Sequence, residues 1–261
     1  MGKVIMVGNR KGGCGKSMTA ASLGFGLAGQ GNKTLVIDMD SQHSLTISLG
    51  VKEPEKLPVT LATVLSNIIE GTEFIPTEGI IHHPEGVDIM PADNSLTDIE
   101  LALVQLMLER ELIMRQYIEM VRPMYDFIII DTSPSLDMLT INALAAADSV
   151  IIPVTPKFLD AKGLELFLKT IRQIQHRVNP KLEIGGILLT MVDKRVNFTK
   201  QIISLLKEAY GGNIHIFDGY IPRSVRAAET SAHGRSIFSL DPKGKVAAAY
   251  TALVEGVLGV A

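Results

Sequence analysis

Residues 11–17 read KGGCGKS and decide the fold class of this chain. They follow a short apolar run, residues 3–7, and precede a segment of helical spacing that begins near Lys16. Glycines let such a loop turn tightly and bring backbone N–H groups close to phosphate oxygens, while the helix offers its positive end. The pattern predicts a phosphate-binding loop in which Lys16 reaches the β- and γ-phosphates and the Ser17 hydroxyl binds Mg²⁺. The alternative is a glycine-rich turn with two solvated lysines.

Outside this loop, short runs rich in Val and Ile alternate with longer segments of helical spacing. This alternation predicts parallel strands joined by right-handed helical crossovers, and runs that are apolar throughout indicate strands covered on both faces. We therefore predict an α/β fold, a single-domain P-loop NTPase over residues 1–261, with a mostly parallel, twisted sheet flanked by helices on both faces. Strands are expected at residues 3–7, 34–37, 87–90, 127–130, 149–154 and 184–190, with a short one near Ile216.

Two helices have recognisable starts. Residues 95–98 follow the pattern S-x-x-D, a variant of the capping box, which predicts a long helix through Leu112. Asp241 and Pro242 read as the cap and first residue of a last helix that runs to about Leu258.

Two further stretches receive structural interpretations. The Met-rich stretch 106–120 has helical spacing and is expected to belong to the core. His82 and His83 are adjacent residues beside a proline, a poor arrangement for a shared metal, and both are expected at the surface.

Two of the apolar runs end in acidic residues. Asp131 directly follows residues 127–130, where its carboxylate can hold the water ligands of a metal beside the phosphate loop. The alternative is an aspartate that only caps a turn after a buried strand. Asp38 and Asp40 follow the second apolar run, in the stretch LVIDMDSQ.

Composition restricts the remaining possibilities. The chain has 261 residues, 46% hydrophobic and 20% charged, which is ordinary for a globular protein. The formal net charge of -3 means that contact with nucleic acid would need a local basic patch. A single cysteine, Cys14, allows no internal disulfide and no Cys-rich metal site. The chain has no signal-peptide pattern and no apolar stretch long enough for a bilayer, so a cytoplasmic location is expected.

Three motifs carry a family resemblance. KGGCGKS resembles the deviant Walker A motif of the ParA/MinD family, FIIIDTSPSL its Walker B segment, and LVIDMDSQ its DxDPQ segment. Similarity extends over nearly the whole chain and is greatest to the small ParA/Soj form without an N-terminal helix-turn-helix. The chain departs from the family's patterns at Arg10, where ordinary P-loops have glycine, at Ser41 and Ser133, where the family has proline, and at His43.

The resemblance implies an ATPase whose cofactors are ATP and Mg²⁺. In this family the signature lysine, here Lys11, crosses to the partner's nucleotide in an ATP sandwich dimer, and Asp40 helps to position the attacking water. Asp38 would support the loop or the metal shell. The implied catalytic residues are Lys11, Lys16 and Asp40, and the implied metal residues are Ser17, Asp131 and Asp38.

The resemblance also implies nucleotide and DNA contacts. The phosphates would meet Lys11, Gly12, Gly13, Cys14, Gly15, Lys16, Ser17 and Met18, and the adenine would meet Met191, Asp193, Pro222 and Ser224. Relatives of this type bind DNA without sequence preference once ATP has closed the dimer. The candidate cations here are Arg223, Arg195, Lys194, Lys200, Arg226 and Arg235.

These expectations point to DNA partitioning with a ParB-like partner, in the cytoplasm and on the nucleoid when ATP is bound. Two alternatives remain: a nucleotide-gated regulator of replication or conjugative transfer, and a MinD-like positioning ATPase. The tail VAAAYTALVEGVLGVA carries almost no positive charge, which argues against docking on a membrane. An iron–sulfur carrier would need cluster-ligating cysteines, and Cys14 lies inside the phosphate loop.

Overall fold

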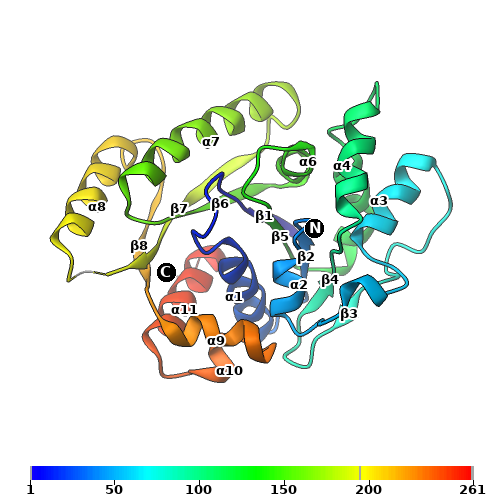
Figure 1. The fold of residues 1–261 in the computed structure, drawn as a ribbon. Helices are drawn as coiled ribbons and strands as arrows, with labels where there is room; N and C mark the ends of the chain where they lie inside the picture. Colours follow the sequence, from blue (N-terminus) through cyan, green and yellow to red (C-terminus); the bar gives the residue numbers. More distant parts are fainter. Residues whose placement is uncertain (1, 194, 260–261) are drawn as a thin grey trace.

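A central sheet organises the fold (Figure 1). The structure, a computed structural model, describes residues 2–193 and 195–259. Within this part of the chain the sheet has eight strands in the order β3-β4-β2-β5-β1-β6-β7-β8. All neighbouring pairs are parallel except β3 with β4, so the predicted mostly parallel sheet is confirmed.

Every predicted run forms a strand, and the structure adds the short strand β3, which was not predicted. They are β1 (Lys3–Val7), β2 (Thr34–Met39), β3 (Ile81–His82), β4 (Asp88–Met90), β5 (Phe127–Thr132), β6 (Ser149–Val154), β7 (Glu183–Val192) and β8 (Ile216–Pro222).

Helices connect the strands and cover both faces of the sheet. They are α1 (Lys16–Gly29), α2 (Ser44–Ser48), α3 (Leu61–Glu70), α4 (Leu96–Gln105), α5 (Ile113–Val121), α6 (Met138–Ala146), α7 (Phe158–Arg177), α8 (Asn197–Tyr210), α9 (Val225–His233), α10 (Ile237–Leu240) and α11 (Lys245–Leu258), with short 3-10 turns η1 (Pro54–Lys56) and η2 (Arg122–Met124).

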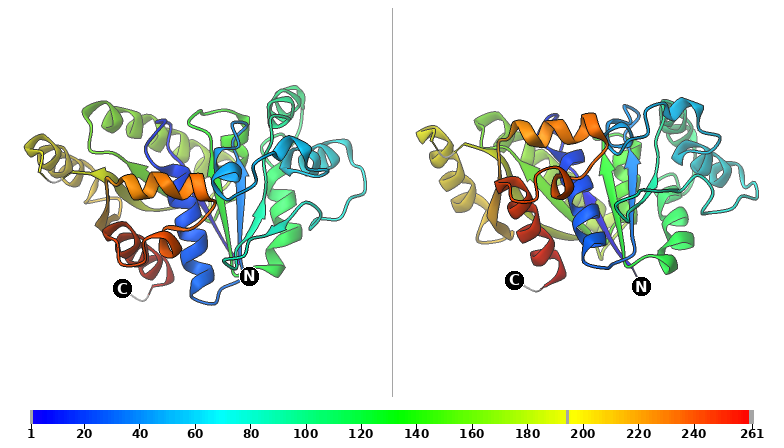
Figure 2. Two further views of the ribbon diagram at one scale, coloured as in Figure 1. Left: turned by 60° about the horizontal axis from the view of Figure 1, so that its bottom comes forward. Right: turned by 90° about the horizontal axis from the view of Figure 1, so that it is seen from below.

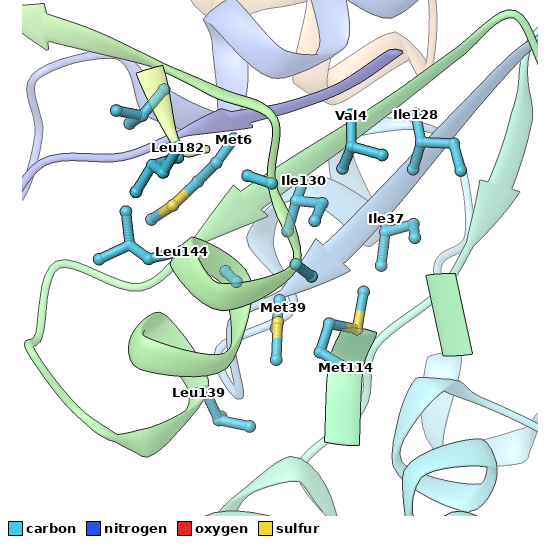
Figure 3. Packing of buried hydrophobic residues seen from close by; sticks show 14 of the residues in the cluster. Val4, Met6, Ile37, Met39, Met114, Ile128, Ile130, Leu139, Leu144 and Leu182 are labelled. Atoms are coloured by element: carbon cyan, nitrogen blue, oxygen red, sulfur yellow. The ribbon is translucent and has the colours of Figure 1, made fainter. Parts of the chain in front are cut away.

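The two helical layers form two hydrophobic cores on opposite faces of the sheet (Figure 2). Val4 and Met6 of β1 pack on the side of α3 to α8, whereas Ile5 and Val7 pack on the side of α1 and α11. This alternation follows from the strand period of two. Figure 3 shows the first core, in which Met6 lies among side chains from neighbouring strands and helices.

The apolar tail of the chain belongs to the second core. Val246, Tyr250, Leu253 and Val254 of α11 are buried, and α11 packs beside α1 (Figure 1). The prediction of its end at Leu258 is confirmed, but the helix begins at Lys245 and not at the Asp-Pro pair. No described helix is both long and apolar enough to cross a membrane.

The predicted long helix through Leu112 is wrong, because α4 ends at Gln105 and α5 begins only at Ile113. Asn142 of α6 fixes the break: its Oδ1 accepts from Met114 N at 3.1 Å, and its Nδ2 donates to Arg110 O at 2.7 Å. These bonds give the backbone between the two helices partners that a continuous helix would have supplied within itself.

Ser95 also does not cap α4 with its side chain. Its backbone N instead donates to Asp93 Oδ1 at 3.1 Å, so the turn before the helix is an Asx turn.

The Met-rich stretch and the two histidines each divide between surface and core. Met114 is fully buried, but Met107 is 96% exposed, so the core prediction holds for only part of the stretch. His82 is exposed as predicted, whereas His83 is buried. The His83 ring contacts Gly234 O through Nε2 at 3.1 Å and accepts from Glu85 N through Nδ1 at 3.1 Å, which fixes Nε2 as the protonated nitrogen.

Candidate functional site

The phosphate loop connects β1 to α1 in a conformation that requires glycine. Gly13 and Gly15 have φ of 69° and 86°, in the left-handed region, and Gly15 occupies the N-cap of α1. No side chain caps α1, so its first backbone N–H groups are available to an anion.

Polar side chains on neighbouring strands hold this loop in place. Asn9 Nδ2 donates to Pro153 O at 2.6 Å, and Asn9 Oδ1 accepts from Lys11 N at 3.1 Å. Thr190 Oγ1 at the end of β7 donates to Cys14 O at 2.7 Å. The loop is therefore preorganised by contacts to β6 and β7.

The two lysines of the loop occupy different positions. Lys16 is buried, and its Nζ donates to Lys11 O at 3.2 Å across the loop. Lys11 lies at the exposed surface of the loop. Lys16 thus lies inside the loop, whereas Lys11 is exposed to solvent.

Asp131 is a buried carboxylate with no partner. It is 1% exposed, and neither of its oxygens has a hydrogen bond. Burial and then the charge of Asp38 raise the pKa of Asp131 well above its ordinary value, and the nearby Ser17 hydroxyl and Lys16 ammonium oppose this. An unpartnered buried carboxylate is unfavourable unless a ligand completes it. The Asp131 carboxylate is therefore suited to binding a cation.

Asp38 lies directly beside Asp131 in the register of β2 and β5 but is fully partnered. Its Oδ2 accepts from Thr46 N at 2.8 Å and Thr46 Oγ1 at 2.7 Å, and its Oδ1 accepts from Asp40 N at 3.1 Å. Burial raises its pKa to about 6, and the bonds from Thr46 limit the rise. This geometry favours the loop-supporting role of Asp38 over the expected metal role.

Asp40 is half-buried at the end of β2, where the chain turns toward α2. Its Oδ1 accepts from Gln42 N at 2.9 Å, and its charge contributes to the raised pKa values of Asp38 and Asp131. The three carboxylates therefore share one region at the carboxyl edge of the sheet. His43 follows with φ of 41° and approaches Glu55 Oε1 at 3.4 Å.

A cavity of about 1020 Å³ adjoins the phosphate loop. Gly15 and Met18 line one side of it, and the ends of β7 and β8 line the other. The expected base contacts Met191, Asp193, Pro222 and Ser224 all lie in its wall. The structure thus brings together two distant stretches of sequence that were expected to meet the base.

Comparisons with known proteins show the family of this chain. Residues 2–184 match a family described as an AAA domain. The sporulation initiation inhibitor protein Soj of Bacillus subtilis is 37% identical over 257 residues, with 98% of each chain covered. The chain belongs to the ParA/Soj family of P-loop ATPases. The chromosome partitioning protein ParA of Caulobacter vibrioides is 33% identical over 258 residues, covering 98% of this chain and 94% of that protein.

Solved structures share the same fold. A protein named cobyrinic acid a,c-diamide synthase, from Mycobacterium smegmatis, was crystallised with an ATP analogue and magnesium; it matches with a TM-score of 0.84 and 31% identity, covering 99% of this chain and 95% of that chain. A putative plasmid partition protein from Borrelia burgdorferi B31, bound to AMPPNP, matches with a TM-score of 0.80 and 27% identity, covering 99% of each chain.

The basic residues expected to meet DNA in this ParA-type chain differ in their surroundings. Arg195 forms an ion pair with Asp193 at 2.6 Å, and Arg226 one with Glu229 at 3.0 Å. The bonds from Arg195, with a smaller contribution from Arg223, lower the pKa of Asp193 to about 2. These pairings reduce the charge that Arg195 and Arg226 offer to phosphate.

The other candidates are also exposed where they are described. Arg223 lies on the wall of the base cavity, Lys200 lies on α8, and Arg235 donates to Ser239 Oγ at 2.5 Å. Lys194 lies outside the described residues.

A network of hydroxyls and a carboxylate holds the loop after β5, where this chain departs from the family's proline. Ser133 Oγ donates to Asp137 Oδ2 at 2.9 Å, and Ser135 Oγ donates to the same oxygen. Asp137 also caps α6, since its Oδ1 accepts from Thr140 N at 2.8 Å. Pro134 of this loop faces Gly12 of the phosphate loop.

Sequence reasoning missed the residues that position the site. Asn9, Thr46 and Thr190 touch no expected ligand, but each fixes a loop that carries one. A signal was available for Asn9 and Thr190, which are polar residues at the carboxyl ends of apolar strands, next to the ligand edge. Thr46 had no such signal, because it lies in the short helix α2.

Proposed function

We propose that this chain is an ATPase of DNA partitioning, which hydrolyses ATP to ADP and phosphate. The observation that carries the proposal is Asp131, whose two oxygens lie unpartnered beside Lys16 and Ser17 behind a preorganised phosphate loop. The ParA and Soj relatives and the nucleotide complexes of similar structures support it.

Residues of one subunit would bind the triphosphate. The backbone N–H groups at the start of α1 would bind phosphate oxygens, and Lys16 would bind them in place of its bond to Lys11 O. The Ser17 hydroxyl and Asp131 would hold Mg²⁺, and the unpartnered carboxylate fits the water ligands of that ion. When bound, Mg²⁺ neutralises charge on the phosphates.

The base would enter the cavity between the phosphate loop and β8. Met191 and Pro222 offer apolar surface there, and Asp193 and Ser224 offer polar groups. Its volume of about 1020 Å³ lies at the upper end of the usual range for small-molecule sites.

Hydrolysis would depend on positioning more than on a strong base. Asp40 is placed at the open end of the site and would orient the attacking water. The exposed Lys11 would cross to the nucleotide of a second copy, so that ATP closes a homodimer and hydrolysis opens it. This arrangement explains why the loop carries a second lysine.

The dimer would bind DNA without sequence preference and respond to a ParB-like partner. Arg223 is the first candidate, because it lies exposed beside the nucleotide cavity, where dimer closure doubles the number of cations. We place the protein in the cytoplasm, and on the nucleoid when ATP is bound.

The first test is ATP turnover and molecular size of the wild type, Lys11→Ala, Lys16→Ala and Asp40→Ala. Lys16→Ala should weaken ATP binding roughly 30-fold or more, since it removes a buried charge partner. Lys11→Ala should bind ATP but stay monomeric, and Asp40→Ala should dimerise without hydrolysing. Normal hydrolysis by Asp40→Ala would refute the role of Asp40, and a monomeric wild type with a nonhydrolysable analogue would refute the sandwich.

The second test is binding of arbitrary duplex DNA with ADP and with a nonhydrolysable ATP analogue. Arg223→Ala should weaken ATP-state binding and lower the salt slope by about one per copy. Lys181→Ala, an exposed cation on the turn before β7, is the matched control and should leave binding unchanged. Equal DNA binding in both nucleotide states would remove the proposed switch.

A second candidate is a nucleotide-gated regulatory protein, which the name of the Bacillus subtilis relative favours. Stimulation of ATP turnover by DNA supports partitioning. Nucleotide-dependent binding to a protein target, without any binding to DNA, supports regulation. A MinD-like positioning ATPase would instead bind lipid vesicles in the ATP state.

A further inference from the structure

The helix α9 forms one wall of the base cavity, but apolar packing anchors it only weakly. Ser224 at its N-cap and Ala227, Ala228 and Ser231 within it line the cavity. Thr230 is the one buried residue of its nine, all of which the structure describes, and it is polar. A helix on the surface of a globular protein is usually positioned by a buried apolar face. The position of α9 therefore depends on other contacts.

Contacts to a turn from the N-terminal half of the chain hold the carboxyl end of α9. The turn, residues 83–87, joins β3 to β4. The Glu85 carboxylate accepts from Ser236 N at 3.1 Å and from Ser236 Oγ. The His83 ring donates from Nε2 to Gly234 O at 3.1 Å. We call these contacts of His83 and Glu85 with Gly234 and Ser236 the clasp.

The turn that carries the clasp is fixed by its own hydrogen bonds. His83 N donates to Val87 O at 2.8 Å, and Gly86 N donates to His83 O at 2.9 Å. Glu85 N donates to His83 Nδ1 at 3.1 Å, so the backbone of the turn orients the His83 ring. This ring also packs against Phe25 of α1 in a T-shaped arrangement, with ring centroids 4.9 Å apart. The clasp thus connects α9 to the sheet and to α1.

A close approach of two glycines lies beside the clasp. Gly234 is the C-cap of α9, with φ of 59°, and Gly50 follows α2 with φ of 96°. A Cβ on Gly234 would lie 2.7 Å from Gly50 Cα, so a side chain at this position would force the two segments apart. Figure 2 shows α9 running from β8 toward α2. The helix is therefore held by β8 at its start and by the clasp at its end.

We propose that Glu85 is a positioning residue for nucleotide binding, which holds α9 as a wall of the base cavity without lining the cavity itself. Water has little access to the clasp, since Ser236 is 3% exposed and Glu85 is half-buried. Hydrogen bonds to a carboxylate are stronger than bonds between neutral groups, and small displacements of binding groups have large effects. The effect on nucleotide rests on the proposed function, whereas the effect on α9 does not.

The test compares binding of a nonhydrolysable ATP analogue with binding of inorganic tripolyphosphate, which has the phosphates without the base. Glu85→Ala removes the carboxylate of the clasp, and Glu85→Gln keeps an acceptor for Ser236 N. The matched control is Glu70→Ala, because Glu70 Oε1 also accepts from a serine, Ser66 Oγ at 2.8 Å, but on α3. Titration calorimetry in the presence of Mg²⁺ measures each affinity.

The base should account for the whole effect of the clasp. Glu85→Ala should bind the analogue roughly tenfold more weakly than the wild type, but tripolyphosphate within about twofold of it. Glu85→Gln should lose about threefold or less for the analogue, and Glu70→Ala should match the wild type with both ligands. In turnover, Glu85→Ala should raise KM for ATP by about tenfold and leave kcat within about twofold.

Hydrogen exchange tests the clasp without nucleotide. The amides of α9 should exchange about tenfold faster in Glu85→Ala than in the wild type, while those of α1 stay unchanged. Ser236→Ala is a second variant, which removes one bond to Glu85 and the side-chain cap of α10 and should change α9 in the same direction by less. A single cooperative melting transition shows that each variant is folded.

Four results would contradict the proposal or its basis. Unchanged exchange of the α9 amides in Glu85→Ala refutes the clasp. Equal affinity of Glu85→Ala and the wild type for the analogue refutes the positioning role. An equal loss for the analogue and tripolyphosphate assigns Glu85 to general stability and also refutes that role. A wild type that binds both ligands equally refutes the proposed base cavity, while the exchange comparison still decides whether the clasp holds α9.

Discussion

β2 and β5 each hold a buried aspartate next to their last residue, and the two aspartates differ in their hydrogen bonds. Asp38 accepts three hydrogen bonds from its own segment. Asp131 accepts none, although the loop after it is rich in hydroxyl groups. Those hydroxyls bond to Asp137 instead. The register of the sheet places the two aspartates side by side, so their depth does not explain the difference.

The comparison separates a carboxylate used for folding from one kept for a ligand. Asp38 fixes the turn toward α2, and its partners compensate for burial. For Asp131, burial and the neighbouring carboxylates outweigh the opposing effects of Ser17 and Lys16, and a buried group with so strongly shifted a pKa is characteristic of functional positions. The four predictions below test this separation, from the largest expected effect to the smallest.

The largest loss of stability is expected for Thr46→Val, which removes hydrogen bonds in the segment after β2. The threonine hydroxyl donates to Asp38 Oδ2, and its oxygen accepts from Ala92 N at 3.0 Å, so the valine removes one of the two bonds to Asp38 Oδ2 and leaves the buried Ala92 N without this acceptor. The expected loss is roughly 2–4 kcal/mol, or a Tm lower by about 4–16 °C. Calorimetry of the nucleotide-free protein measures it. Thr132→Val, which removes one 3.3 Å bond to Val7 O, is the control and should lose less.

Asp131→Asn should raise the stability of the nucleotide-free protein, whereas Thr46→Val should lower it. It removes a buried charge that repels Asp38 and Asp40, and burial and this repulsion outweigh the opposing effects of Ser17 and Lys16. The Tm of the nucleotide-free protein should rise by roughly 2–8 °C, the equivalent of about 1–2 kcal/mol. A lower Tm would mean that Asp131 contributes to folding and would contradict the separation.

The advantage of Asp131→Asn should grow with pH. Because the pKa of Asp131 is raised in the folded state, the unfolded chain releases this proton first, and stability falls as pH rises above the ordinary value of 3.8. Asparagine does not titrate, so the variant does not lose stability in this way as the pH rises. The difference in Tm between variant and wild type should therefore be near zero at pH 4 and increase toward neutral pH, and a difference independent of pH would show that the charge is not its cause.

Ser133→Ala should have the smallest effect. Asp137 Oδ2 keeps its bond from Ser135, and Oδ1 keeps its bond from Thr140 N, so stability should change by less than about 1 kcal/mol. If this network positions the loop for hydrolysis, kcat should fall a fewfold while KM for ATP stays constant. A raised KM with unchanged kcat would assign Ser133 to binding instead.

Strand prediction succeeded where the apolar pattern was local. β1 and β6 begin and end at the predicted residues, since β6 is buried throughout and β1 is buried from Val4 to Val7. β5 extends two residues beyond its prediction to Asp131 and Thr132, because pairing with β2 continues after the apolar run stops.

The errors have a common physical cause, which is contact between residues distant in sequence. The helical spacing continues past Gln105, and only Asn142 on another helix imposes the break. His83 is buried because it meets Gly234 at the other end of the chain. The loop between β1 and α1, by contrast, is specified by its own glycines, and its place between a strand and a helix was predicted from local sequence.

The two aspartates were the hardest to distinguish. Both end apolar strands and both matched acidic motifs, so sequence reasoning gave both a metal role. The two aspartates differ because Thr46, eight residues after Asp38, donates two hydrogen bonds to Asp38 and none to Asp131. No periodicity in the sequence carries that information.

A magnesium titration at saturating ATP analogue tests the central claim most directly. If the Asp131 carboxylate holds Mg²⁺, Asp131→Asn should raise the Mg²⁺ concentration for half-maximal stabilisation by at least about tenfold. Thr46→Val should leave that concentration within about twofold of the wild type. An unchanged magnesium requirement in Asp131→Asn would contradict the account.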